Sequence, residues 1–160
     1  YNEFVFEFLT KHDNTYLTEL HQMFMQKVIR PQMRPKGFDA IKKHQDLGHA
    51  IVGITATSDF ITAPIFREFG ITEIIATNAE VLDGKYTGKV TGLPCYQKGK
   101  LARLDQWLQG RAVDESWAYS DSINDRFLLE YATHAIAVNP DDRLEKLARE
   151  QGWEIQDWSI

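Results

Sequence analysis

The chain has 160 residues, a formal net charge of −5 and a hydrophobic content of 43%. This length and composition are those of a globular domain with a sizeable core, and they exclude a disordered chain. The acidic balance argues against nucleic acid and against an anionic membrane as partners, because both attract basic surfaces. The single cysteine, Cys95, excludes an internal disulfide and favours a reducing, cytoplasmic location. No apolar run reaches the length of a membrane span, no signal peptide is recognisable, and nothing indicates an oligomeric state.

The first part of the chain has the pattern of helices. Apolar residues recur at helical spacing, and Asp13 stands where it can cap the longer of the expected helices. Pro31 ends this helix, and Pro35 begins the next one. We therefore expect residues 1–35 to form part of a helical cap and residues 36–160 to form an α/β domain.

From residue 49 onward, short apolar runs alternate with helical patterns. The Asp83-Gly84 dipeptide between two such runs predicts a hairpin. Alternating strands and helices predict the α/β class, with a doubly wound (Rossmann-like), mostly parallel sheet of about five strands. The strands expected for this sheet cover 49–54, 73–76, 134–138 and 153–158, with another beginning at Trp117, and the hairpin strands cover 80–82 and 86–90. The expected helices cover 38–47 and 60–69 and begin again near Lys98, Asp125 and Asp142.

Two carboxylates, Asp121 and Asp125, lie four residues apart where a short apolar strand ends and a helix begins. Open α/β sheets place their ligands at the carboxyl ends of strands. Paired carboxylate oxygens suit Mg²⁺, which combines them with water and phosphate oxygens. The alternative is an N-cap aspartate followed by an aspartate in the first helical turn.

Two further polar clusters stand near the ends of expected strands or at the start of helices. Thr55 and Ala56 follow the run at 49–54, where a hydroxyl and backbone N–H groups can hold a phosphate oxygen; the alternative is a Ser/Thr turn. Lys98 and Lys100 open a helix, where the helix dipole disfavours a cation. Lysine is a common partner of phosphate, and the alternative is a solvated surface lysine. A hydroxyl, a lysine and paired carboxylates together suit phosphoryl transfer.

These motifs resemble those of the haloacid dehalogenase superfamily, subfamily IB, in its phosphoserine-phosphatase-like branch. The stretch at 51–57, Ile-Val-Gly-Ile-Thr-Ala-Thr, is similar to the second motif, an apolar strand that ends in Ser or Thr. Gly99-Lys100 resembles the motif lysine. The stretch at 120–125, Ser-Asp-Ser-Ile-Asn-Asp, resembles the fourth motif, usually Gly-Asp-Ser-x-x-Asp, with Ser120 in place of the glycine.

The resemblance implies a Mg²⁺-dependent phosphomonoester hydrolase that acts on a small phosphorylated metabolite. It implies that Thr55, Ala56 and Lys100 hold the phosphoryl oxygens, with Thr55 and Lys100 as catalytic residues. It also implies that Asp121 and Asp125 hold Mg²⁺. Phosphoserine, histidinol phosphate and other small phosphate esters all stay open as substrates. The candidate substrate contacts are Arg34 and Asn124.

One motif of the family is missing. The first motif, Asp-x-Asp-x-Thr, supplies the nucleophile that forms an aspartyl-phosphate and a second aspartate as general acid/base, and the 160 residues contain no such stretch. The motif belongs to the central strand and normally lies upstream of the point where this chain begins. We therefore expect the natural protein to be longer and the core over 36–160 to lack its first strand. A non-catalytic binding or regulatory domain, or an inactive fragment, stays open as the alternative.

Overall fold

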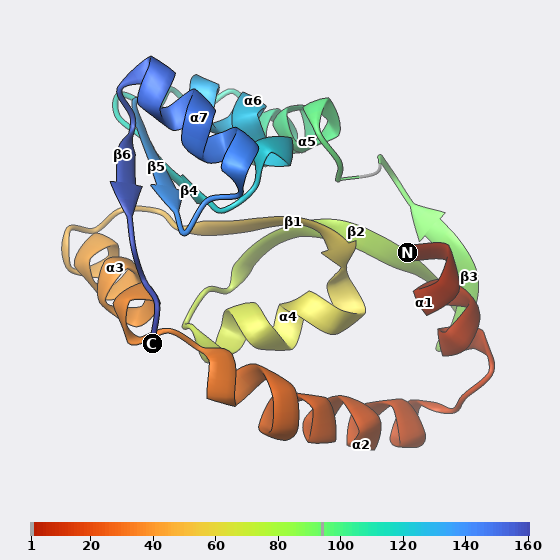
Figure 1. Cartoon of the computed structure of the whole chain (residues 1–160). Helices are drawn as coiled ribbons and strands as arrows, with labels where there is room; N and C mark the ends of the chain where they lie inside the picture. Colours follow the sequence, from red (N-terminus) through yellow and green to blue (C-terminus); the bar gives the residue numbers. More distant parts are fainter. Residues whose placement is uncertain (1, 94) are drawn as a thin grey trace. The chain divides into compact units, whose positions relative to one another are not determined.

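The computed structural model describes residues 2–93 and 95–160 (Figure 1). The chain forms two compact units, Tyr1–Cys95 and Tyr96–Ile160, and each is described by itself. The expected N-terminal helix is followed from Asn2, since Tyr1 lies outside the described residues. The domain boundary expected after residue 35 stays a prediction from the sequence.

The first unit begins with helices, as the sequence predicts. They are α1 (Asn2–Thr10), α2 (Asn14–Phe24), the π-helical turn η1 (Met25–Ile29), the 3₁₀ turn η2 (Arg30–Gln32) and α3 (Pro35–Asp46). Asp13 caps α2, because its carboxylate accepts a hydrogen bond from the backbone N–H of Tyr16 at an N···O distance of 2.9 Å. Pro35 takes the first position of α3, where its missing N–H costs no helical hydrogen bond.

A three-stranded sheet follows in the same unit. It consists of β1 (Val52–Ser58), β2 (Glu73–Leu82) and β3 (Lys85–Thr91), with α4 (Asp59–Glu68) between β1 and β2. β1 and β2 pair in parallel, and β2 and β3 pair antiparallel. Figure 1 shows α4 beside the β1–β2 pair and α1 beside β3. The hairpin turn is confirmed: Asp83 and Gly84 both have positive φ, 50° and 75°, as a type I′ turn requires.

The predicted bounds of the first strand are wrong. β1 begins at Val52 and not at His49, because the backbone N–H of His49 donates to the carbonyl oxygen of His44 at 3.0 Å and completes the end of α3. The strand then continues through the hydroxyl residues to Ser58, which pairs with Thr77 of β2. Residues that favour turns on their own are held extended here by pairing with a neighbouring strand.

The predicted strands at 73–76 and 80–82 form one continuous strand, β2. Its pairing with β3 shifts register between Ala79 and Val81. A bulge of this kind adds a residue without ending the strand, so the polar segment that separated the two predicted strands stays paired.

The core of the first unit joins its helices to its sheet. The buried side chains come from α1 and α2, and partly buried ones from α4, β2 and β3 pack against them. The buried members are Val5, Phe6, Leu9 and Leu17. β1 also packs closely on α4: a Cβ added at Gly53 would lie 2.6 Å from atoms of the Phe66 ring. Glycine at this position therefore lets the helix ring lie directly on the strand backbone.

The second unit is a parallel three-stranded sheet with helices. In chain order it contains α5 (Lys98–Leu108), β4 (Trp117–Ser120), the 3₁₀ turn η3 (Ile123–Asp125), α6 (Arg126–Tyr131), β5 (His134–Val138), α7 (Asp142–Gln151) and β6 (Glu154–Gln156). The strands lie in the order β4-β5-β6, all parallel. α6 and α7 pack on the same face of β5 through a buried cluster of Leu129, Ala135, Ala137, Leu144 and Ala148.

The predicted last strand, 153–158, is too long, because β6 ends at Gln156. The backbone N–H of Trp158 donates to the side-chain oxygen of Asn139 at 2.8 Å, so the chain leaves the sheet there. The strand predicted at 134–138 is confirmed.

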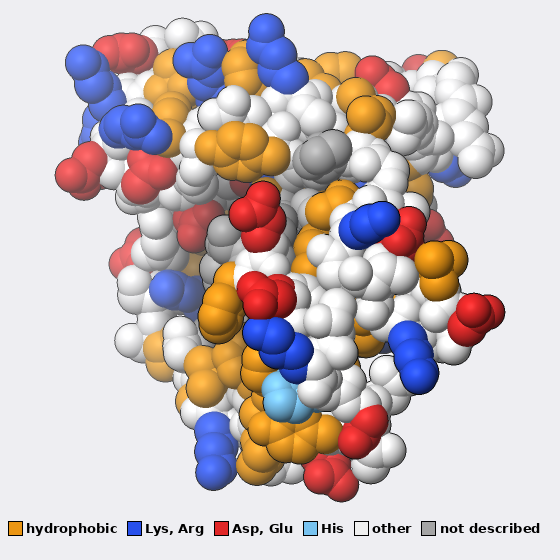
Figure 2. All heavy atoms as spheres, turned by 90° about the vertical axis from the view of Figure 1, so that its right-hand side faces the viewer, with side chains coloured by type: hydrophobic (Ala, Val, Ile, Leu, Met, Phe, Trp, Pro, Cys, Tyr) orange, Lys and Arg blue, Asp and Glu red, His pale blue; other side chains and the backbone are white. Residues whose placement is uncertain are grey.

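The described residues thus have the α/β, Rossmann-like fold that the sequence predicts, with six strands in two sheets. Within residues 2–93 and 95–160, no helix is both long enough and apolar enough to cross a membrane. The face drawn in Figure 2 intermingles acidic, basic and hydrophobic side chains.

Candidate functional site

Lys100 and Asp125 form an ion pair in the second unit. Lys100 is the third residue of α5, and its ammonium donates a hydrogen bond to Oδ1 of Asp125, the last residue of η3. Both side chains are largely shielded from solvent, with exposed fractions of 8% for Lys100 and 17% for Asp125. A lysine rarely lies buried unless it is paired. The solvated-surface alternative therefore does not describe Lys100.

Lys98 has a different environment, although it lies only two residues away. Its side chain is exposed, and its ammonium lies 5.5 Å from the centroid of the Phe127 ring. A cation over an aromatic face at an exposed site contributes about 0.5–1 kcal/mol. Of the two lysines that open α5, only Lys100 meets a carboxylate among the described residues.

The second oxygen of Asp125 is also bound. The hydroxyl of Ser120, the last residue of β4, donates to Oδ2 of Asp125 at 2.8 Å. The same hydroxyl oxygen accepts a hydrogen bond from the backbone N–H of Ser122 at 3.2 Å. Asp125 therefore has one protein donor on each oxygen, Lys100 and Ser120. Sequence reasoning recorded Ser120 only as a departure from the family's glycine and missed this contact.

Asp121 lies between these residues in sequence but has a different environment. Its side chain is exposed, and no described residue donates a hydrogen bond or an ion pair to its carboxylate. Its backbone is fixed, because its carbonyl oxygen accepts from the N–H of Asp141 at 2.8 Å. The result is a carboxylate on a fixed backbone that is open to a ligand from solvent.

Asp141 holds the loop that carries both carboxylates. Its Oδ2 accepts from the backbone N–H of Ile123 at 2.9 Å, and its Oδ1 accepts from that of Leu144 at 2.8 Å, as the N-cap of α7. These two backbone hydrogen bonds, that of Ile123 first, hold the pKa of Asp141 below its ordinary value. The helix that the sequence predicts to begin near Asp142 is confirmed, but the sequence gives no signal for the bond of Asp141 to the loop.

The residues predicted to hold phosphate in the first unit lie at an irregularity of β1. The register with β2 shifts between Ile54 and Ser58, a segment that includes Thr55 and Ala56. The half-buried Thr55 accepts a hydrogen bond on Oγ1 from the backbone N–H of Thr57 at 3.1 Å. This is the local bond of the Ser/Thr turn alternative, and it leaves the hydroxyl proton of Thr55 available to a ligand. The phosphate role of Thr55 and Ala56 stays a prediction.

The two candidate substrate contacts lie in different units. Arg34 is half-buried and stands at the N-cap position of α3 in the first unit. Asn124 lies exposed in η3 of the second unit, and its backbone N–H donates to Oγ of Ser122 at 3.3 Å. The role of each residue as a substrate contact therefore stays a prediction.

The donor set near β4 fits a magnesium ion better than zinc. No group of three or more His, Cys, Asp or Glu side chains able to hold a metal occurs within the described part of the chain. Structural zinc sites need four such ligands and catalytic ones three. Mg²⁺ instead binds through one or two carboxylates and keeps water and phosphate oxygens as its other ligands. Asp121 and Asp125 provide such carboxylates.

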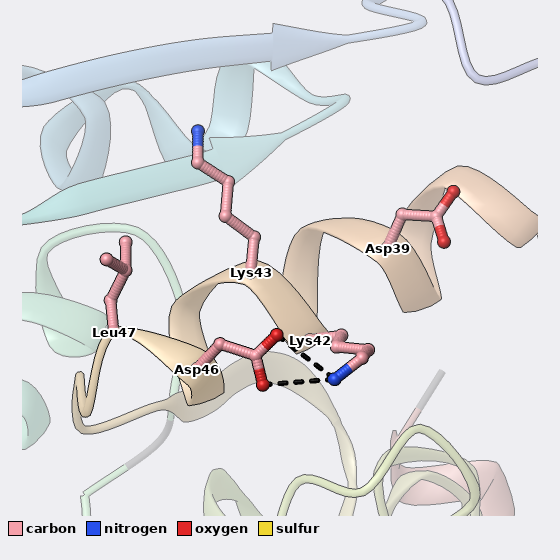
Figure 3. A pocket seen from close by; sticks show the side chains of 5 residues that line it. All are labelled: Asp39, Lys42, Lys43, Asp46 and Leu47. Atoms are coloured by element: carbon pink, nitrogen blue, oxygen red, sulfur yellow. Dashed lines mark hydrogen bonds and ion pairs between the residues drawn. The ribbon is translucent and has the colours of Figure 1, made fainter.

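A hollow on α3 contains none of the predicted site residues (Figure 3). It is lined by Asp39, Lys42, Lys43, Asp46 and Leu47. The ammonium of Lys42 lies 3.0 Å from both carboxylate oxygens of Asp46, one helical turn away. Both side chains are mostly exposed, so this is a surface helix pair.

Comparison with known proteins gives the family. The sequence profile described as haloacid dehalogenase-like hydrolase matches residues 1–130. The chain belongs to the haloacid dehalogenase-like hydrolase family. A histidinol-phosphatase of Neisseria meningitidis serogroup C is 39% identical over 153 residues, which cover 92% of this chain and 69% of that protein. Phosphoserine phosphatase SerB1 of Mycobacterium tuberculosis is 35% identical over 146 residues, covering 90% of this chain and 47% of that protein.

Solved structures of other proteins share this fold. A Bordetella pertussis protein of unknown function superposes with a TM-score of 0.93 at 40% identity, covering 99% of this chain and 73% of that one. A phosphoserine phosphatase solved with a phospho-aspartyl intermediate analogue superposes with a TM-score of 0.57 at 22% identity, over 76% of this chain and 57% of that one, which shows the fold alone. The chain spans about half the length of the mycobacterial relatives it matches.

Proposed function

We propose that the protein is a Mg²⁺-dependent phosphomonoester hydrolase. The observation that carries the proposal is the shielded Lys100–Asp125 ion pair next to the exposed carboxylate of Asp121 at the carboxyl end of β4. A fixed ammonium group suits the oxygens of a phosphoryl group, and an open carboxylate suits a hard cation. Relatives named as phosphatases support the same reaction class.

In this proposal the residues of the two units have separate roles. Lys100 and Thr55 are the catalytic residues that hold phosphoryl oxygens, with the backbone of Ala56 next to Thr55. Asp121 and Asp125 hold Mg²⁺. When bound, Mg²⁺ neutralises charge on the phosphoryl group and helps to position it.

We propose covalent catalysis through an aspartyl-phosphate. A carboxylate attacks phosphorus, the P–O ester bond breaks, the alcohol leaves with a proton, and water then hydrolyses the acyl phosphate. The 160 residues contain no Asp-x-Asp-x-Thr stretch. The proposal therefore takes the nucleophile and the general acid/base from outside them, and the 160 residues alone are expected to be inactive.

For the substrate we propose a small phosphorylated metabolite in the cytoplasm, with Arg34 and Asn124 as contacts to its non-reacting part. Two relatives, 39% and 35% identical to this chain, are named for histidinol phosphate and for phosphoserine. Both compounds are phosphate esters that carry an amino group, so phosphorylated amino alcohols and amino acids are the first compounds to test.

The experiment is phosphate release by the natural protein from L-histidinol phosphate, O-phospho-L-serine and p-nitrophenyl phosphate, with Mg²⁺, after EDTA and after Mg²⁺ is restored. We expect turnover that EDTA abolishes and Mg²⁺ restores. Binding of phosphate without any turnover would instead support the non-catalytic binding domain, the alternative that the missing first motif favours. Turnover by the 160 residues alone would contradict an outside nucleophile.

A further inference from the structure

Ser120 occupies an unusual position for a hydroxyl in this fold. It is the last residue of β4, half-buried, and directly precedes Asp121. The family motif usually has glycine at this position, which has no side chain and cannot bond to Asp125. Here the Ser120 hydroxyl donates to Oδ2 of Asp125 at 2.8 Å while Lys100 donates to Oδ1. The contact therefore comes from this chain's own residue and not from the motif it resembles.

We propose that Ser120 is a positioning residue that fixes the carboxylate of Asp125, one of the two carboxylates proposed to hold Mg²⁺. This inference rests on the proposed function. With a protein donor on each oxygen, the carboxylate of Asp125 is held in one orientation.

The hydrogen-bond inventory of Ser120 shows why its orientation is fixed. A hydroxyl has one proton to donate and two lone pairs. Ser120 gives that proton to Asp125 and accepts from the backbone N–H of Ser122 at 3.2 Å. The acceptor bond holds the hydroxyl in the loop, so its proton points at Asp125. Lys100 alone would leave Oδ2 of Asp125 free to turn.

The size of the effect follows from other metal sites. Removing a group that orients a metal ligand or its neighbour typically lowers metal affinity about 10- to 100-fold. Because Asp125 keeps its partner Lys100 when Ser120 is changed, we expect the low end of this range. Ser120→Ala should therefore weaken Mg²⁺ binding about tenfold. Ser120→Thr keeps the hydroxyl on a strand residue and should stay within about twofold of the natural protein.

The test is calorimetric titration of the natural protein with MgCl₂ in the presence of inorganic phosphate, for Ser120→Ala, Ser120→Thr and Ser116→Ala. Ser116 is the matched control: it lies just before the amino end of β4, where its hydroxyl accepts from the backbone N–H of Thr133 at 3.1 Å. We expect Ser116→Ala to lose some stability to urea but no Mg²⁺ affinity. A weakening confined to Ser120→Ala would support the proposal, since a purely structural role would not separate the two serines.

Three results would overturn it. Ser120→Ala could bind Mg²⁺ as tightly as the unchanged protein, which would leave the hydroxyl without a role in the site. Ser120→Thr could bind as weakly as Ser120→Ala, which would assign the effect to packing. If the unchanged protein takes up no Mg²⁺ at all, the proposed function fails, and this inference fails with it. The first two results leave the proposed function intact.

Discussion

The ammonium of Lys100 and the carboxylate of Asp125 form the most shielded ion pair among the described residues, with 8% and 17% of the two side chains exposed. The other lysine and arginine pairs of the described chain have at least one partner that is half exposed or more. Buried ion pairs contribute little net stability against apolar replacements, but they are costly to break on one side. The position of this pair is therefore better explained by the chemistry of the site than by stability.

Asp125→Asn should destabilise the protein, because it leaves the Lys100 ammonium shielded without its counter-charge. We expect a loss of roughly 2–3 kcal/mol in the free energy of unfolding, somewhat below the usual range for a fully buried pair. The matched control is Asp46→Asn, which breaks the exposed pair with Lys42 (Figure 3) and should cost under about 1 kcal/mol. Urea unfolding measures both, and equal losses would contradict the account.

Gly53→Ala should destabilise β1 against α4. The added methyl group would meet ring atoms of Phe66 at 2.6 Å, so the ring or the strand must shift. Such overpacking costs about 1–3 kcal/mol. Phe66→Leu in the same chain should recover part of this loss, although Phe66→Leu alone is expected to destabilise. Thermal unfolding of the natural protein, the two single variants and the double variant would show whether the two changes compensate. Strictly additive losses of stability would refute the steric explanation.

Stability should fall as the pH is lowered through the histidine range. The Nδ1 atoms of His44 and His49 lie 2.9 Å apart, so one ring donates a hydrogen bond to the other. Burial lowers the pKa of His44, and His49 and Lys43 lower it further.

The sign follows from proton binding. Below an ordinary histidine pKa of about 6.5, His44 binds a proton in the unfolded chain but not in the folded protein. The stability that neutral His44 contributes is therefore fully present above this pH and is lost as the pH falls toward the lower pKa of the folded state. We expect the thermal midpoint to fall between about pH 7 and 5, and His44→Leu to flatten this dependence. An equally steep fall of the thermal midpoint with pH in the natural protein and in His44→Leu would contradict this explanation.

Asp141→Ala should weaken both α7 and the loop that carries the carboxylates. Loss of a capping carboxylate costs about 1 kcal/mol, and here the bond to Ile123 is lost as well. Since the folded pKa of Asp141 is lowered, its contribution is present above the unfolded value of about 3.9 and lost as the pH falls through the folded pKa. Asp142→Ala, one residue on, should cost only a few tenths of a kcal/mol. Urea unfolding at pH 7 and pH 3 measures the loss of stability in Asp141→Ala and in Asp142→Ala.

The sequence predicted most elements because their signals are local. The helix starts at Asp13 and near Asp142, the turn at Asp83-Gly84 and the apolar strand at 134–138 each depend on neighbouring residues. The bounds of β1 and β2 could not be read in this way. Their hydroxyl and amide residues stay extended only because another strand pairs with them.

The candidate site, too, could be predicted from the sequence only in part. Lys100, Asp121 and Asp125 follow from motif spacing, and the structure brings Lys100 and Asp125 together. The contact of Ser120 with Asp125 and the second bond of Asp141 depend on how a loop folds back on a strand end and a helix start. Single-residue patterns do not report such tertiary hydrogen bonds.

The most direct test of the account compares two aspartates that follow strands of the same sheet, Asp121 after β4 and Asp157 after β6. Phosphate release from p-nitrophenyl phosphate at a fixed Mg²⁺ concentration is measured for the natural protein, Asp121→Asn and Asp157→Asn. The account predicts a loss of at least about 100-fold for Asp121→Asn, the order of one lost electrostatic contact to the transition state. It predicts near-unchanged activity for Asp157→Asn, whose carboxylate accepts hydrogen bonds from Asn139 and Ser159 at the end of β6. Full activity in Asp121→Asn, or equal loss in both variants, would contradict the assignment of the site to the end of β4.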